Sequence, residues 1–181
     1  MRSASASSAC VNCMNCRSSV GCTIRRTRPW STSDGPMKRH AALHGLSGEH
    51  HRALVLARRL RNLTQDVQPA AVQELLALWR AEVGPHFIAE EERLLPLFAR
   101  YSAPDHPLII ETLRQHVLMR SLLDEIGELV DAHETPLAPL HALGDALREH
   151  VRFEENELFP AVEAALPEAQ LQRLQMYFMS L

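Results

Sequence analysis

The sequence predicts an all-α protein: an up-down-up-down four-helix bundle followed by a short C-terminal helix. From His40 onward apolar residues recur every three or four positions, which is the period of an amphipathic α-helix. Glycine is scarce, at 7 of 181 residues, whereas leucine, alanine, glutamate and arginine, all good helix formers, are abundant. Short segments rich in proline or polar residues separate four long periodic stretches, as between antiparallel neighbours in a bundle.

The first two helices are expected over residues 43–63 and 69–101. In the first, Ala53 and Ala57 lie on the apolar stripe, so a neighbouring helix can approach closely. The second contains a Gly-Pro pair ending at Pro85. Because proline lacks an amide hydrogen, this helix should kink or break there.

The other two long helices are expected over residues 106–132 and 137–164, with a short amphipathic helix over 167–179. Pro107 suits the first turn of its helix, where the missing amide hydrogen has no cost. No pair of strands is visible in the pattern, so the whole folded part is expected to be helical.

Residues 1–36 are expected to form a disordered leader, and residues 37–181 the folded domain. Five Arg and one Asp give the leader a net charge of +4, whereas 14 Lys and Arg against 21 acids give the rest −7. The leader is rich in serine and has no helical or strand period, so it cannot bury enough apolar surface to fold. An upstream extension before a start at Met37 is the alternative.

All four cysteines of the chain lie in this leader. They form a C-x2-C-x2-C-x5-C run made of Cys10, Cys13, Cys16 and Cys22. Thiolates at this spacing can hold zinc or an iron–sulfur cluster. Because no scaffold surrounds the run, an unstructured leader is the preferred interpretation.

Charge and hydropathy exclude several classes of protein. A net charge of −3 with a pI near 6.4 argues against a general nucleic-acid binder. No stretch approaches the roughly 18 to 20 apolar residues that span a bilayer. The folded part has no cysteine, as expected in a reducing compartment. We therefore expect a cytoplasmic protein without nucleic-acid or membrane partners. The sequence does not indicate which proteins it binds.

An internal repeat carries the chemistry. Residues 86–96, HFIAEEERLLP, and residues 150–160, HVRFEENELFP, both read H-x3-E-E-x2-L-x-P. A further histidine precedes each motif: His50 lies 36 residues before the first motif, and His116 lies 34 residues before the second. The chain is therefore expected to be two αα-hairpins in tandem.

The spacing of the motif predicts a metal site. Residues four apart on a helix face the same way, so each H-x3-E pair presents one imidazole and one carboxylate to the bundle interior. Four imidazoles and two carboxylates suit two ions, with two histidines on each and both carboxylates bridging, and this donor set selects Fe, Mn or Zn over Mg or Ca. An unpaired carboxylate on a core face would cost several kcal/mol, which disfavours a purely structural role. The six candidate metal ligands are His50, His86, Glu90, His116, His150 and Glu154.

Two assignments depend on helical phase. His50 and His51 are adjacent and only one can face the core; His50 is in phase with Ala53 and Ala57, so it is assigned as the ligand. The second acids of the motifs, Glu91 and Glu155, lie about 100° around the helix from the first. They are expected to be solvated or to support a ligand rather than to bind metal.

At these residues the sequence resembles the hemerythrin-like HHE cation-binding domain, over about residues 41–165. The resemblance implies a four-helix bundle holding a non-heme di-iron centre, with two iron ions (Fe2+/Fe3+) and an oxo or hydroxo bridge. Oxygen-carrying hemerythrins have a fifth histidine from an H-x3-H pair, but here Thr112 stands four residues before His116. One iron therefore loses a nitrogen ligand and each keeps an open position. The chain looks closer to HHE proteins linked to iron sensing, nitric-oxide chemistry and repair of iron–sulfur centres.

Three functions remain open at this point. The first is a di-iron protein that binds or senses O2, NO or iron, and the second is a redox enzyme of the same centre, acting on NO or peroxide or donating iron for cluster repair. The third is a helical interaction module without metal. No other catalytic motif is present, so whether the protein is an enzyme is left open. A ferritin-like site needs E-x-x-H on two helices, whereas the order here is H-x3-E.

Overall fold

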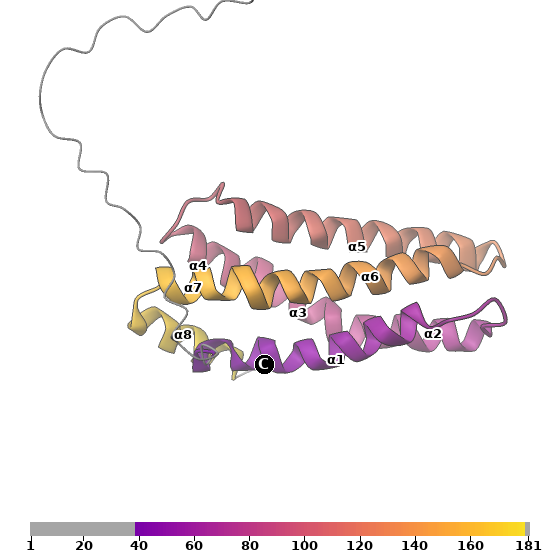
Figure 1. The fold of residues 1–181 in the computed structure, drawn as a ribbon, viewed down its shortest axis with the longest axis horizontal. Coiled ribbons are helices and arrows are strands. Elements are labelled where there is room, and N and C mark those ends of the chain that lie inside the picture. Colours follow the sequence, from indigo (N-terminus) through magenta and orange to yellow (C-terminus); the bar gives the residue numbers. More distant parts are fainter. Residues whose placement is uncertain (1–38, 180–181) are drawn as a thin grey trace, which may run out of the picture. The chain divides into compact units, whose positions relative to one another are not determined.

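The computed structural model describes residues 39–179, and this part of the chain is helical throughout (Figure 1). A short 3-10 turn, η1 (Ala41–Leu43), leads into α1 (His44–Arg61). The elements that follow are α2 (Pro69–Leu78), the π turn η2 (Trp79–Val83), α3 (Gly84–Ala89), the π turn η3 (Glu90–Leu94), α4 (Leu95–Ala99), α5 (Pro107–Asp131), α6 (Leu137–Phe153), the π turn η4 (Glu154–Leu158), α7 (Phe159–Ala165) and α8 (Glu168–Phe178). None of the described helices is long and apolar enough to cross a membrane.

These elements join into continuous helical stretches. The stretch from α2 to α4 is unbroken over residues 69–99, and α6 to α7 is unbroken over 137–165. With α1, α5 and α8 they give five stretches, each within a few residues of the helices that the sequence predicts. The expected leader and its four cysteines lie outside the described residues.

Every π turn of these stretches is followed by a proline. In each, an amide donates to the carbonyl five residues earlier; the pairs are Gly84 to Trp79, Leu95 to Glu90 and Phe159 to Glu154. The next residue in each case is a proline, at positions 85, 96 and 160. A proline has no amide hydrogen and its ring clashes with the preceding turn, so the helix widens by one residue. At Pro85 the helix therefore continues through a π turn, so the local break that the sequence allowed there does not occur.

The core consists of two apolar clusters with a polar layer between them. One cluster includes Ala57, Leu76 and Ile126, and the other includes Leu46, Phe98 and Leu174. Along α1, α5 and the two longest stretches, the buried histidines and glutamates fall between residues of one cluster and residues of the other. The apolar layers thus enclose the polar one from both ends of the bundle.

Helix α6 packs against both α1 and α5 (Figure 1). A Cβ placed on Gly144 of α6 would lie 2.7 Å from the carbonyl oxygen of Ala57. The small residues on the α1 stripe therefore allow the close approach that the sequence predicts. The last helix, α8, packs on η1 and on α1.

Candidate metal centre

All six predicted ligands are buried in the polar layer. His50 comes from α1, His86 from α3, His116 from α5 and His150 from α6, while Glu90 and Glu154 open the π turns η3 and η4. None is more than 5% exposed, and both glutamates are fully buried. Their position follows from the core period on each helix, with an apolar cluster on either side.

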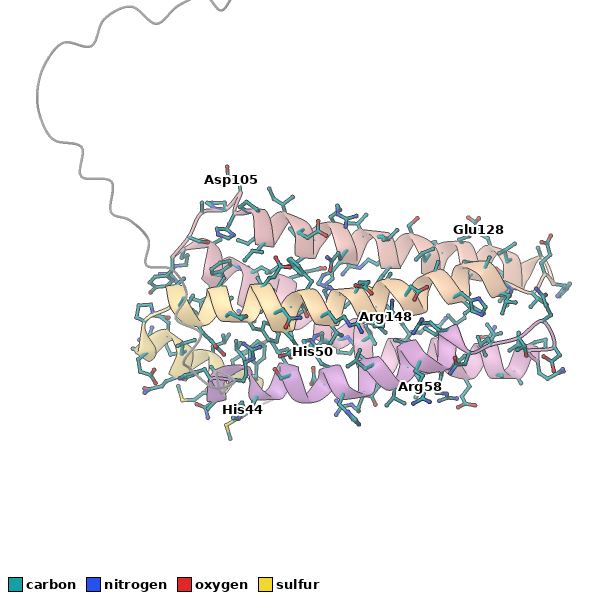
Figure 2. All side chains as sticks on the ribbon, viewed as in Figure 1. His44, His50, Arg58, Asp105, Glu128 and Arg148 are labelled. Carbon is teal, nitrogen blue, oxygen red and sulfur yellow. The ribbon has the colours of Figure 1, made fainter. Side chains whose placement is uncertain are left out.

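The helical phase of α1 is as the sequence predicts. His50 is 3% exposed, whereas His51 lies on the surface. In Figure 2 the side chain of His50 lies between α1 and α6, while Arg58, further along α1, points away from the bundle.

The six side chains form two overlapping groups. In the first, ligand atoms of His50, His86 and both glutamates all lie within 4.8 Å of one another. In the second, the same holds for His116, His150 and both glutamates. Two histidines in each group and two carboxylates common to both is the pairing that the sequence repeat predicts.

Each imidazole turns its Nε2 atom toward the carboxylates. The Nε2 atoms of His50 and His150 lie 3.0 and 3.4 Å from Oε2 of Glu154. Glu90 uses its two oxygens separately: Oε1 lies 3.2 Å from Nε2 of His86, and Oε2 lies 3.4 Å from Nε2 of His116. Glu90 therefore reaches both groups at once, as a bridging carboxylate must.

Three of the four carboxylate oxygens at the centre lack hydrogen-bond partners, and the fourth, Oε2 of Glu154, contacts Nε2 of His50. Both oxygens of Glu90 and Oε1 of Glu154 are buried without one. Among residues 39–179 no lysine or arginine forms an ion pair with either side chain. A buried carboxylate without a partner costs several kcal/mol, and a cation between the imidazoles and carboxylates would remove that cost. Imidazole nitrogen and carboxylate oxygen together suit Fe, Mn or Zn.

The outward nitrogen of every imidazole is also held. Nδ1 of each histidine donates to an acceptor on a different helical stretch: His50 to Glu155 at 2.6 Å, His86 to Glu49 at 2.7 Å, His116 to Glu91 at 2.7 Å and His150 to Gln115 at 2.9 Å. A proton fixed on Nδ1 leaves the lone pair of Nε2 facing inward, which is the tautomer that a metal requires.

These acceptors occupy equivalent positions in the two halves of the internal repeat, as the predicted ligands do. Glu91 and Glu155 each follow a central glutamate, and each accepts from the imidazole of a predicted ligand, as expected for one of the two roles that the sequence left open. Glu49 and Gln115 were not predicted. The sequence nevertheless offered a clue to both residues, because each stands directly before the first histidine of its repeat.

Charged neighbours shift the pKa values of the first group. Burial disfavours the charged form of His86, but the carboxylates of Glu90, Glu154 and Glu49 raise its pKa well above 6.5. The pKa of His50 is also raised, since Glu154 and Glu155 outweigh burial. In the second group, burial lowers the pKa of His150. His150 therefore binds a proton less readily than His50 or His86.

A small cavity adjoins the centre. Its volume is about 10 Å³, and its lining includes His50, His86 and His150 on one side. The rest of the lining consists of two glutamates, Glu49 and Glu82, and five apolar residues, Ala53, Val83, Phe87, Leu147 and Val151. Such a volume admits about one water-sized molecule.

Comparison with known proteins identifies the family. Residues 41–162 match the model of the hemerythrin HHE cation-binding domain. Comparison with curated proteins and with solved structures gave no match. The match covers well over half of the 181 residues and includes all six buried histidines and glutamates of the centre. The buried His/Glu groups fit a metal-binding protein of this kind, and the chain belongs to the hemerythrin HHE cation-binding family.

Proposed function

We propose that the protein holds a pair of iron ions at this centre and binds or senses a small ligand there. One ion would be held by His50 and His86, the other by His116 and His150, with Glu90 and Glu154 between the two ions. The observation that carries the proposal is Glu90, which is fully buried, lacks hydrogen-bond partners and faces one imidazole of each pair. We also propose that the long helices form the up-down-up-down bundle that the sequence predicts.

The residues around the centre prepare it for a cation. Bound iron would supply redox chemistry and a site for a diatomic ligand. The Nδ1 hydrogen bonds keep each Nε2 lone pair directed inward, and the two carboxylates would offset part of the charge of the ions. The apolar clusters on both sides limit the access of water.

The cavity supports O2 or NO as the ligand. Each group offers four donor atoms, which leaves open positions on an ion of higher coordination number. The cavity beside His50, His86 and His150 is small and mostly apolar, which suits a neutral diatomic molecule better than a charged metabolite. Glu49, Glu82 and His86 also line a surface groove of about 400 Å³, so this side offers a short route from solvent.

A redox enzyme of the same centre is the second candidate. The same open positions and cavity would serve consumption of NO or peroxide, or release of iron for cluster repair. Turnover distinguishes the two: a binding or sensing protein takes up O2 or NO in a fixed ratio to protein, whereas an enzyme consumes it over many cycles.

The proposal is tested by measuring metal content per chain after anaerobic purification, with absorption spectra before and after air. We expect about two irons per chain and a near-ultraviolet band of an oxo-bridged pair after air. His50→Ala should lose most of this iron, whereas His51→Ala, a matched change on the adjacent exposed residue, should keep it. A protein that binds no iron, or a single zinc, would contradict the di-iron proposal.

A further inference from the structure

We propose that the two metal positions are unequal, and that residue 115 makes them so. The position of His50 and His86 takes up the first cation, and that of His116 and His150 takes up the second. This inference rests on the proposed function and assigns an order of loading within that site. Glu49 and Gln115 act here as positioning residues, because they reach a metal only through an imidazole.

The two positions differ in the hydrogen-bond acceptors that contact Nδ1 of their histidines. At the first position both acceptors are carboxylates, Glu155 and Glu49. At the second position Glu91 is a carboxylate, but the acceptor for His150 is the amide oxygen of Gln115 at 2.9 Å. The internal repeat places Glu49 and Gln115 at equivalent positions, so the acceptor changes from a charged group to a neutral one with little else altered.

The neutral acceptor is fixed in place. Nε2 of Gln115 donates to Oε1 of Glu111 at 2.7 Å, so its amide oxygen is the atom left to face His150. Glu111 is held in turn by two hydrogen bonds from Arg114, both 2.7 Å long. The amide therefore cannot turn without losing this chain of contacts.

The outer arginines do not cancel the difference. Arg39 contacts Glu155 at 2.8 Å, and Arg120 contacts Glu91 at 2.7 Å, so each position has one carboxylate neutralised in the same way. Arg52 comes only within 3.9 Å of Glu49 and pairs with Glu82 instead. Glu49 is thus the least neutralised of the three carboxylates, and it belongs to the first position.

A carboxylate that accepts from Nδ1 makes the imidazole a stronger donor to a metal than an amide does. Removing such a partner typically costs 10- to 100-fold in metal affinity. The first position, with two carboxylate acceptors, should therefore bind a cation more tightly by about that factor.

The test measures both stepwise dissociation constants for Fe2+ on the full chain, by anaerobic competition with a chromophoric chelator. It is done at alkaline pH, where protons compete least for the imidazoles of His50 and His86. Glu49→Gln should weaken the first step at least tenfold and leave the second within a few-fold. Glu92→Gln is the control: it removes the same charge from an exposed glutamate two residues from Glu90 that contacts neither an imidazole nor Arg52. It should leave both steps within a few-fold.

A second variant acts on the other position without changing the net charge. The double substitution Glu111→Gln with Gln115→Glu exchanges the amide and the carboxylate. It should strengthen the second step about tenfold and change the first by no more than the statistical factor of about two. Glu111→Gln alone is its control and should not strengthen either step.

Three outcomes would overturn the inference. In the first, the double variant strengthens the first step instead of the second. In the second, Glu49→Gln and Glu92→Gln weaken the first step equally, which would assign the effect to charge rather than to the contact with His86. In the third, Glu49→Gln weakens both steps alike, which would indicate a merely structural role. If the unaltered chain binds no Fe2+, the proposed function fails and this inference with it, whereas two bound ions with the wrong response to the variants contradict the inference alone.

Discussion

Nδ1 of His50 donates to Oε1 of Glu155 at 2.6 Å, across 105 residues of sequence. Glu155 directly follows Glu154, whose Oε2 lies 3.0 Å from the other nitrogen of the same imidazole. Two consecutive glutamates of η4 therefore hold one imidazole from α1 at both of its nitrogens. The paired acids of the motif thus have separate tasks: the first faces the interior and the second orients a histidine of another stretch.

Glu155→Ala should lower the affinity for iron by about 10- to 100-fold while the fold is retained, because His50 loses the acceptor that fixes its tautomer. The measurement is iron bound per chain at limiting free Fe2+, with far-ultraviolet circular dichroism to check the helices. Glu157→Ala, on an exposed residue of the same π turn, is the control and should bind iron like the unaltered chain. Equal affinity in both variants would count against the role of Glu155.

Glu90→Gln should change the stability of the metal-free and metal-bound forms in opposite directions. Without metal, and at an alkaline pH where His86 has lost its proton, the substitution removes a buried carboxylate whose oxygens have no hydrogen-bond partner. The new amide can then donate to Nε2 of His86 or His116. We expect the free energy of unfolding of the metal-free form to rise by about 1 to 3 kcal/mol. With iron present the unaltered chain should be the more stable one, because the variant loses its bridge and binds little metal.

Thermal unfolding with a chelator and with anaerobic Fe2+ measures both effects. Glu92→Gln, an exposed residue two positions along, is the control for the change of charge. A Glu90→Gln protein that is less stable without metal than the unaltered chain would show that Glu90 is satisfied without a cation.

Metal affinity should rise as the pH rises above about 6.5, the ordinary pKa of histidine. The pKa values of His50 and His86 are raised, so the metal-free protein carries protons there that a cation must displace. A raised folded-state pKa stabilises the metal-free fold below the unfolded value of about 6.5, and this contribution is lost as the pH rises through the folded-state pKa. Rising pH should therefore weaken the metal-free fold and strengthen metal binding.

Calorimetric titration with Fe2+ in buffers of different ionisation enthalpy counts the protons released. The number should fall as the pH rises, because fewer imidazoles are protonated before binding. A dissociation constant that does not change with pH would show that no proton is displaced.

The sequence predicted which histidines and glutamates come together in the interior, because helical phase and the repeated motif indicate the same residues. His50 shares its phase with Ala53 and Ala57, and the H-x3-E spacing places His86 and Glu90 on one face. The π turns were not predicted, because a proline within a helical pattern allows a kink, a break or a widened turn, and only the packing of the neighbouring helices decides. Glu49 and Gln115 were missed for a related reason: each acts on a histidine of another stretch, and the helical period of its own stretch carries no information about that contact.

The close contact between α6 and α1 gives a last prediction, because a pair of glycines separates helix propensity from packing. Gly127 lies inside α5 with nothing within 4 Å of its added Cβ, so Gly127→Ala should raise the free energy of unfolding by roughly 0.5 to 1 kcal/mol. Gly144 also lies inside a helix, but its added Cβ would meet the carbonyl oxygen of Ala57 at 2.7 Å. Gly144→Ala should therefore lower the free energy of unfolding by about 1 to 3 kcal/mol in denaturant titrations. Gly144→Ala should weaken iron binding as well, because moving α6 away from α1 separates Glu154 from His50. If both substitutions raised the free energy of unfolding, α1 and α6 could move apart without destabilising the protein.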